Sequence, residues 1–283
     1  MSRDAIAAMP PLREVIAEHR LSAEKSLGQN FLLDLNLTAR IARSAGDLSG
    51  VHVVEIGPGP GGLTRALLMS DAETVTAIER DRRIADVLAP MSDAAEGRFR
   101  FVEGDAMEVD AASLVPAPRA IIANLPYNIA TPLLIGWLEQ ASHWQSLTLM
   151  FQKEVALRIV ATPGSKAYGR LAVLTALTAQ AQIALTLPPQ AFTPPPKVES
   201  AVVHLVPHAD QPAPDLLQAV SKVTAAAFGQ RRKMLRKSLS PLFVDTEASL
   251  ISLDIPPTAR AETIPPDGFR ALATLWLEQR GAR

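Results

Sequence analysis

The sequence predicts an α/β protein with a doubly wound sheet and a smaller helical domain after it. Short apolar runs alternate with segments of helical periodicity between residues 51 and 161, which is typical of strands that are joined by helices. A glycine-rich turn links the first of these runs to its helix. From residue 215 onward, the apolar spacing is that of helices alone.

The length and composition of the chain suit two domains and exclude several kinds of chemistry. With 283 residues, of which 48% are hydrophobic, the chain can form one large core and a smaller one. It contains no cysteine, which excludes disulfides, thiolate catalysis and cysteine-bound zinc. His204 and His208 are four residues apart, but Pro207 between them argues against a helical metal pair. We therefore expect no metal site.

No segment of the sequence indicates a membrane span or an export signal. The apolar runs stay well short of the ~20 residues that cross a bilayer. Residues 1–9 carry Asp4 and lack the apolar core of a signal peptide. We expect a cytoplasmic protein that does not enter membranes and is a monomer.

The expected elements follow one another in a regular order. Apolar runs without helical spacing are expected to be strands, at 51–56, 75–78, 99–103, 120–123, 147–151 and 201–206. Segments with helical apolar spacing, several of them bounded by Pro, Gly or Asp, are expected to be helices, at 34–45, 63–69, 81–91, 133–140, 153–161, 171–180, 215–228, 231–240, 247–253 and 267–279. A short helix after Pro10 and Pro11 precedes them. The chain then divides into an N-terminal extension (1–24), an α/β domain (25–207) and a helical C-terminal domain (208–283).

A glycine motif between the first strand and its helix predicts a nucleotide or nucleoside site. Gly57, Gly59 and Gly62 satisfy the spacing G-x-G-x-x-G, and Glu79 ends the next apolar run about twenty residues later. The same pattern occurs in dinucleotide-binding proteins, which are therefore an alternative.

Two prolines and an acid at the same loop favour a ligand without phosphate. Pro58 and Pro60 remove two of the backbone N–H groups that would hold a phosphate. Glu55, two residues before the first glycine, would repel a pyrophosphate and attract a cation. S-adenosylmethionine has an ammonium, a sulfonium and a ribose diol, and no phosphate. We expect it to be the ligand, with Glu79 accepting hydrogen bonds from its ribose hydroxyls.

The turn after the fourth expected strand suits the alkylation of an amine on a planar ring. Asn124 offers a side-chain carbonyl, and Tyr127 offers a flat face for stacking. Pro126 stiffens the turn and leaves the Leu125 carbonyl free. The alternative is an ordinary turn with a buried tyrosine. Asp105, after the third expected strand, is expected to bind the adenine amine of the cofactor, with a solvated turn residue as the alternative.

Two further segments suggest contacts with a nucleic acid. Phe192 comes shortly before three consecutive prolines, which would hold its ring exposed on a rigid arm for stacking. The alternative is that Phe192 fills the core. Lys166, Tyr168 and Arg170 could contact phosphate, and a solvated helix start is the alternative.

The positive charges of the C-terminal part are concentrated in one expected helix. Although the net charge of the chain is −1, the segment 216–244 contains no Asp or Glu. The basic residues of the expected helix 231–240 are Arg231, Arg232, Lys233, Arg236 and Lys237. Their helical spacing would form a basic face that contacts phosphate, and a merely solvated helix is the alternative.

Seven blocks of the sequence occur in a family-specific order, at 25–34, 54–64, 77–81, 103–106, 124–132, 152–171 and 192–200. As a set they closely resemble the ribosomal RNA adenine N6,N6-dimethyltransferase family. The blocks at 165–170 and 192–200 favour its bacterial small-subunit (16S) branch. The resemblance implies a Rossmann-like class I methyltransferase domain with a smaller all-α C-terminal domain. It also implies dimethylation of two adjacent adenosines near the 3′ end of 16S rRNA, in an immature 30S subunit.

The resemblance, the glycine motif and the turn together give a set of candidate site residues. The candidate cofactor-binding residues are Asn30, Leu32, Gly57, Gly59, Glu79, Asp105 and Asn124. The candidate catalytic residues, which would handle the base, are Asn124, Leu125, Pro126, Tyr127 and Phe192. The candidate RNA-binding residues are Lys166, Arg170, Arg231, Arg232, Lys233, Arg236 and Lys237. Residues 1–24 exceed the usual lead-in of the family and receive no role.

Two other functions compete with this one. A nicotinamide-dependent oxidoreductase would share the glycine loop, but Pro58, Pro60 and the lack of an obvious proton-relay pair disfavour it. A noncatalytic RNA-binding or assembly factor would keep the fold without the chemistry. The intact turn at 124–127 argues against this second alternative.

Overall fold

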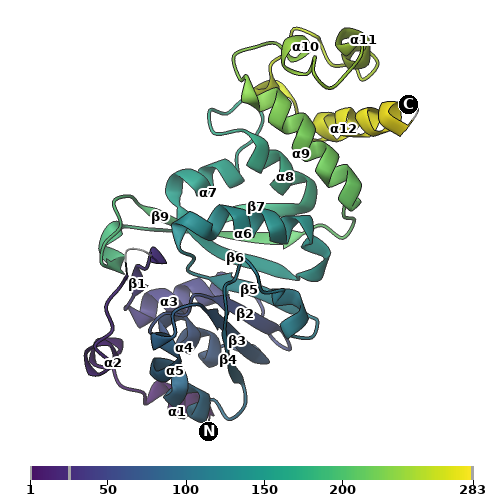
Figure 1. The fold of residues 1–283 in the computed structure, drawn as a ribbon. Helices are drawn as coiled ribbons and strands as arrows, with labels where there is room; N and C mark the ends of the chain where they lie inside the picture. Colours follow the sequence, from purple (N-terminus) through teal and green to yellow (C-terminus); the bar gives the residue numbers. More distant parts are fainter. Residues whose placement is uncertain (1, 25–26, 282–283) are drawn as a thin grey trace. The chain divides into compact units, whose positions relative to one another are not determined.

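A computed structural model describes residues 2–24 and 27–281 of the chain (Figure 1). Within these residues, two compact units can be distinguished. The first contains the described residues up to 134, together with 143–156 and 182–206. The second contains 135–142, 157–181 and the described residues from 207 onward. Each unit is therefore assembled from several separate segments of the sequence.

A seven-stranded sheet with the order β4-β3-β2-β5-β6-β9-β7 is the central element of the fold. Its strands are β2 (His52–Ile56), β3 (Thr74–Glu79), β4 (Phe99–Glu103), β5 (Arg119–Ala123), β6 (Ser146–Gln152), β7 (Ala179–Leu187) and β9 (Ser200–Pro207). The strands from β4 to β6 pair in parallel, and β9 pairs antiparallel with β6. Because β3 lies on one side of β2 and β5 on the other, the strand order reverses there. Open α/β sheets bind ligands at the carboxyl ends of the strands beside such a point.

The strands beside this point are buried on both faces. Val53, Ala120 and Ile122 are fully inaccessible to solvent, as expected for parallel strands that are covered by helices. Helices α3 (Leu35–Arg43) and α4 (Gly62–Met69) pack against each other within the same unit (Figure 1). Helix α3 begins where the Asp34 carboxylate accepts hydrogen bonds from the backbone N–H groups of Asn36 and Leu37.

Twelve α-helices and several shorter elements accompany the sheet in the described chain. The α-helices are α1 (Ser2–Ala7), α2 (Leu12–Glu18), α3 (Leu35–Arg43), α4 (Gly62–Met69), α5 (Arg83–Ala94), α6 (Tyr127–Glu139), α7 (Lys153–Ile159), α8 (Arg170–Thr178), α9 (Pro214–Gly229), α10 (Leu235–Ser238), α11 (Thr246–Ile251) and α12 (Pro266–Gly281). Short 3₁₀ helices lie at Ala111–Leu114, Ala141–His143, Pro189–Ala191 and Ala261–Thr263. Two short strands, β1 (Phe31–Leu32) and β8 (Phe192–Thr193), pair antiparallel as a separate sheet.

The second compact unit has its own helical core. Tyr168, two residues before α8, is fully buried, and its hydroxyl donates to the Ile264 carbonyl at 2.8 Å. The Phe228 ring, on α9, lies between the rings of Tyr168 and Phe269, with centroid distances of 5.9 and 5.4 Å. This aromatic cluster joins α8, α9 and α12 into one unit.

Strand β7 corrects the sequence prediction. We expected a helix to continue through Gln180 and predicted no strand at 179–187. Ala, Gln and Leu have high helix propensity, but here they alternate apolar and polar with the period of a strand. The sheet pairing therefore overrides local propensity.

Helix α6 begins earlier than its proline suggests. The helix was expected to follow Pro132, yet it starts at Tyr127 and contains Pro132. The Pro126 carbonyl accepts from the N–H groups of Ile129 and Ala130, which starts the first helical turn directly at the end of the strand.

The predicted basic helix at 231–240 is wrong. Arg231 and Arg232 lie in a turn after α9, and only the four residues of α10 are helical. The Leu235 N–H donates to the Ala259 carbonyl at 2.8 Å, and Leu235 and Leu239 are fully buried. A continuous helix would need this N–H to bond to the Arg231 carbonyl, so no helix runs from Arg231.

Among residues 2–24 and 27–281, no helix combines the length and the apolar character that crossing a membrane requires. The same residues contain no group of three or more His, Asp or Glu side chains that could hold a metal ion.

Candidate cofactor and catalytic site

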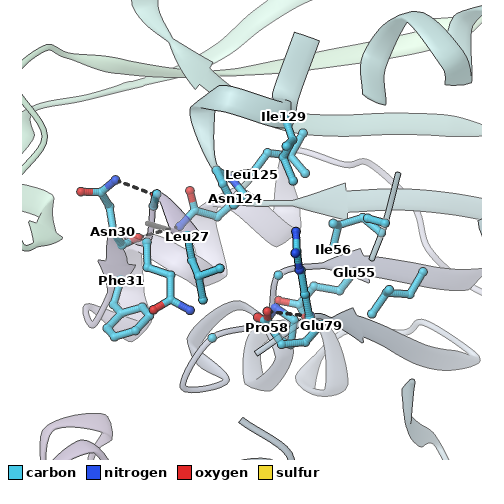
Figure 2. Close-up of a pocket in the computed structure, with 18 of the residues that line it drawn as sticks. Leu27, Asn30, Phe31, Glu55, Ile56, Pro58, Glu79, Asn124, Leu125 and Ile129 are labelled. Carbon is cyan, nitrogen blue, oxygen red and sulfur yellow. Dashed lines mark hydrogen bonds between the residues drawn. The ribbon is translucent and has the colours of Figure 1, made fainter. Parts of the chain in front are cut away.

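A cavity of about 140 Å³ lies at the carboxyl ends of β2, β3, β4 and β5, within the first unit (Figure 2). Its walls come from the segment 27–32, the glycine loop, the ends of β3 and β4, and the turn after β5. The cavity therefore occupies the position that the strand order predicts for a ligand.

The glycine loop is folded tightly under the cavity. Gly57, Gly59 and Gly61 have φ angles of 68°, 52° and 88°, a region that favours glycine. A Cβ atom on Gly62 would lie 2.6 Å from the Leu32 carbonyl oxygen, so a side chain there would collide with the backbone. The motif identified Gly57, Gly59 and Gly62 but missed Gly61, whose left-handed backbone leads into α4.

Glu79 ends β3, and its carboxylate is held by the backbone of the two residues that follow it. One of its carboxylate oxygens accepts from the N–H groups of Arg80 and Asp81, each at 2.9 Å. Burial raises the pKa of Glu79, and these backbone hydrogen bonds oppose the shift. After the neighbouring strand β4, the Asp105 carboxylate accepts from the Met107 N–H at 2.9 Å and from the Arg80 guanidinium at 3.1 Å.

Glu55 is the most deeply buried acid of the cavity, with 1% of its surface exposed. Burial raises its pKa to about 8; the Thr64 side chain opposes this shift and the charge of Glu79 adds to it. Its Oε2 atom has no hydrogen-bond partner among the described residues. A cation or hydrogen-bond donor in the cavity would satisfy this oxygen, so the residues fit a positively charged ligand.

The turn after β5 presents its polar groups to the cavity. The Asn124 Nδ2 atom donates to the Asn30 carbonyl at 3.1 Å, and Figure 2 shows the two residues next to each other. This leaves the Asn124 Oδ1 atom as an acceptor. No backbone hydrogen bond among the described residues occupies the Leu125 carbonyl oxygen. Two acceptors therefore lie in one turn at the cavity.

Tyr127 is half-buried and anchored at its far end. Its hydroxyl forms a hydrogen bond of 2.6 Å with the Ser200 hydroxyl, at the start of β9. Burial raises the pKa of Tyr127, and the bond to Ser200 opposes the shift. Sequence reasoning missed Ser200 as a partner because 73 residues separate the two.

The structure brings all the candidate cofactor-binding residues to this one cavity, namely Asn30, Leu32, Gly57, Gly59, Glu79, Asp105 and Asn124. It adds wall residues that sequence reasoning did not single out, including Gln29, Phe31, Leu63 and Ile129. Contact between the seven residues and a cofactor stays a prediction.

The prediction of an exposed Phe192 ring is wrong. Phe192 is 3% exposed, and it packs in the main core of the first unit. It pairs with Leu32 across the β1–β8 sheet, and only Thr193 of this strand faces solvent. Because alternate residues of a strand point to opposite faces, the large ring takes the buried one. The core alternative therefore holds for Phe192.

The candidate RNA-binding residues all lie in the second unit, but not on one helix. Lys166 and Arg170 are exposed, whereas Tyr168 between them is a core residue. Arg231 forms an ion pair of 3.0 Å with Glu262, and its guanidinium also donates to the Ser165 carbonyl.

Two of these arginines pair with acids that are not their neighbours in the sequence. Arg236 forms an ion pair with Glu247 at 3.0 Å, as Arg231 does with Glu262. Arg232, Lys233 and Lys237 are exposed.

The mainly parallel sheet with its antiparallel β9, the cavity at its reversal point, the glycine loop and the acids at the ends of β2 and β3 are those of a class I methyltransferase. The model of the family "Ribosomal RNA adenine dimethylase" matches residues 20–275. The chain belongs to this family and is an S-adenosylmethionine-dependent rRNA adenine dimethyltransferase.

Individual relatives agree with this assignment. The chain is 60% identical over 279 residues to "Ribosomal RNA small subunit methyltransferase A" of Xanthobacter autotrophicus, covering 97% of this chain and 96% of the relative. Its structure is similar to that of a dimethyladenosine transferase from Plasmodium falciparum, with a TM-score of 0.74, 25% identity, and coverage of 88% and 97%. It is also similar to the 23S rRNA methyltransferase ErmE, with a TM-score of 0.67, 26% identity, and coverage of 88% and 100%.

Proposed function

We propose that this enzyme dimethylates the N6 amines of two adjacent adenosines near the 3′ end of 16S rRNA. The relative that shares 60% of its residues is named for the small subunit, whereas the 23S enzyme shares 26%. The blocks at 165–170 and 192–200 support the same branch.

The hydrogen bond that fixes the Asn124 side chain is the observation on which the proposed chemistry rests. Its amide nitrogen is used by the Asn30 carbonyl, so the amide cannot flip and Oδ1 remains the acceptor. With the Leu125 carbonyl, two acceptors can take both hydrogens of an adenine amine. This arrangement favours a pyramidal nitrogen whose lone pair points away from the acceptors, towards the methyl carbon.

The other cavity residues hold the reactants. When bound, S-adenosylmethionine supplies a methyl group on a positive sulfur; the amine nitrogen bonds to its carbon as the carbon–sulfur bond breaks. Glu79 would accept from the ribose hydroxyls, and Asp105 from the adenine amine of the cofactor. Glu55 would face the positive charge. The target nitrogen becomes cationic on methylation and then loses its proton to water, so no strong base is required.

Tyr127 is the residue proposed to stack on the flipped target base. Unstacking a base costs a few kcal/mol, and an aromatic face in the site recovers part of that cost. The hydrogen bond to Ser200 holds the outer end of the ring and so limits its movement about the Cα–Cβ bond. Phe192 is buried elsewhere and is not proposed for this role.

The second unit is proposed to hold the RNA backbone. Lys166 lies beside Ser165, whose carbonyl accepts from Arg231, so the two predicted basic segments meet within this unit. Exposed lysines and arginines at such a place suit phosphate contacts. We propose that Lys166, Arg170, Arg232, Lys233 and Lys237 contact phosphate. Arg231 and Arg236 keep their acidic partners.

We further propose that the enzyme acts as a monomer, in the cytoplasm, on an immature 30S subunit. Ribosomal RNA is modified where subunits are assembled, which supports this compartment. We also propose that residues 25–207 carry out methyl transfer and that residues 208–283 bind RNA, together with Lys166 and Arg170, which belong to the same compact unit as residues 208–283.

Primer extension on 16S rRNA tests the proposal, because dimethylated adenines block reverse transcription. Cells that lack the protein should lose the paired stops near the 3′ end, and the wild-type gene should restore them. Asn124→Ala should fail to restore them, while the exposed Asn36→Ala, outside the cavity, serves as the matched control. Unchanged stops in the deletion would refute the 16S target. Full restoration by Asn124→Ala would refute the role of the turn.

A further inference from the structure

The segment 27–32 lines the cavity and is fastened to the turn after β5. Gly28, with φ 66°, lies so close to this turn that a Cβ would sit 3.0 Å from the Asn128 side chain and 3.4 Å from Pro126. Two residues later, the Asn30 carbonyl accepts from Asn124. One side of the segment is therefore fixed to the proposed catalytic turn.

Hydrogen bonds of the Gln29 side chain connect the same segment to the end of β3. Its side-chain nitrogen donates to the Asp81 carboxylate at 3.0 Å, and its side-chain oxygen accepts from the Glu24 backbone N–H at 3.0 Å. Asp81 lies two residues beyond Glu79, and its side chain is 5% exposed. Gln29 thus bridges the chain before the cavity segment and the end of β3.

Arg83 completes this bridge. Its guanidinium contacts both oxygens of the Asp81 carboxylate, at 2.9 and 2.6 Å, and its backbone N–H donates to one of them at 3.1 Å. The same guanidinium lies 3.1 Å from the Glu24 carboxylate and donates to the Ser22 carbonyl at 3.4 Å. The bonds from Arg83 lower the pKa of Asp81, so this carboxylate stays charged at neutral pH.

We propose that Asp81 and Arg83 are positioning residues that set the affinity for S-adenosylmethionine through Gln29. Neither residue lines the cavity, whereas Gln29, Asn30 and the rest of the segment 27–32 do. The inference rests on the proposed function in one respect, that this segment contacts the cofactor.

The physical reason is preorganisation. With both sides fastened, the segment is ordered before the cofactor arrives, and binding does not have to supply the ordering entropy. Without Arg83, Asp81 becomes a nearly buried charge without its cation, and Gln29 loses its fixed partner. The loss loosens the segment that also holds Asn124 through the Asn30 carbonyl, but a bound cofactor would order the segment again. The KM for the cofactor should therefore rise, while kcat at saturating cofactor stays the same.

Neighbouring arginines provide a matched experiment. Arg82 is exposed and forms one surface ion pair with Glu103 at 2.6 Å, away from the segment. We expect Arg83→Ala to raise the KM for S-adenosylmethionine about tenfold, as expected for the loss of charge-assisted hydrogen bonds. Arg82→Ala should change it less than about twofold, in line with an exposed pair. Both variants should keep kcat at saturating cofactor within about twofold of wild type.

Hydrogen exchange of the cofactor-free protein tests the fastening itself. Backbone amides of the peptide covering 27–32 should exchange faster in Arg83→Ala than in Arg82→Ala, with no change in the β2 and β3 peptides. In Arg83→Lys, which retains one charge contact, the exchange rate of this peptide should fall between those of the two alanine variants. This variant also provides the test if Arg83→Ala does not fold.

Two results would overturn the inference. One is an equal KM for the two alanine variants in folded protein, even with faster exchange at 27–32, since the segment would then not set cofactor affinity. The other is equal exchange at 27–32. The proposed methylation chemistry is tested independently, by whether Asn124→Ala restores the primer-extension stops.

Discussion

Replacing Glu55 by glutamine should make the protein more stable at neutral pH. Glutamine preserves the shape of the side chain and cannot ionise. In the wild type, the pKa of Glu55 is about 8 in the folded protein, against an ordinary value of 4.5. Between these values the folded protein holds a proton that the unfolded chain has released. The free energy of unfolding therefore falls as pH rises from about 4.5 to 8 and levels off above that.

The size of the effect follows from the linkage. One pKa unit corresponds to about 1.4 kcal/mol, so at pH 7 the raised pKa costs the wild type at most about 3 kcal/mol. Relaxation of the cavity around the charged form reduces this cost. We therefore expect the free energy of unfolding at pH 7 to be about 1 to 3 kcal/mol higher for Glu55→Gln than for the wild type. At pH 5 the advantage should shrink to about 0.8 kcal/mol or less.

Urea unfolding of the two proteins without cofactor, at pH 5, 6, 7 and 8, measures this difference directly. Glu79 is present in both proteins, so most of its own titration cancels. A difference in the free energy of unfolding that does not grow with pH would refute the reasoning. Calorimetry gives a second readout. The affinity of the wild type for S-adenosylmethionine should rise with pH up to about 8, because the cation favours ionised Glu55, and the variant should lack this part of the pH dependence.

Three further predictions concern the cofactor, the RNA and the helical core. Glu79→Ala should weaken S-adenosylmethionine binding by about 1.5 to 3 kcal/mol, the usual value for charged hydrogen bonds, and unchanged calorimetric affinity would remove Glu79 from the site. Changing Arg232 and Lys233 together to Ala should weaken binding to pre-30S particles and reduce the slope of log affinity against log salt concentration by about one or two units. The control Arg270→Ala, which only breaks an ion pair with Asp267 in the same helix, should leave this slope unchanged. Equal slopes for the double variant and the wild type would reject the phosphate contacts. Tyr168→Phe should lower the free energy of unfolding by about 1 kcal/mol, because a buried hydrogen bond is lost, and an unchanged urea midpoint would contradict this.

The cofactor site could be predicted from the sequence for a physical reason. Strands that are buried on both faces appear as apolar runs, and parallel strands bring their ends to one edge of the sheet. Glu79 and Asn124 stand at the ends of such runs, and Asp105 follows the partly exposed edge strand β4, so all three lie at the same edge of the sheet. The paired acceptors at 124–125 were predictable because the chemistry of one short turn is local.

The errors come from features that depend on distant partners. Whether Phe192 points inward is decided by its pairing with Leu32, far away in the chain, and a rigid proline arm does not reveal it. Spacing of charges alone suggested a helix at 231–240, whereas the buried Leu235 and its bond to Ala259 decide the backbone there. The bridge from Gln29 to Asp81 spans 52 residues and leaves no local pattern.

The interleaving of the two units limits how this enzyme can be cut and recombined. Tyr168, Ala172 and Val173 belong to the same core as Phe269 and Trp276, although the long segment 182–206 of the other unit separates them in sequence. A fragment that begins after residue 207 would leave behind the α8 residues of that core. Exchanging C-terminal tails between relatives would likewise pair one protein's α8 with another's α9 and α12. Chimaeras are therefore expected to fold well only when residues 157–181 travel together with the tail.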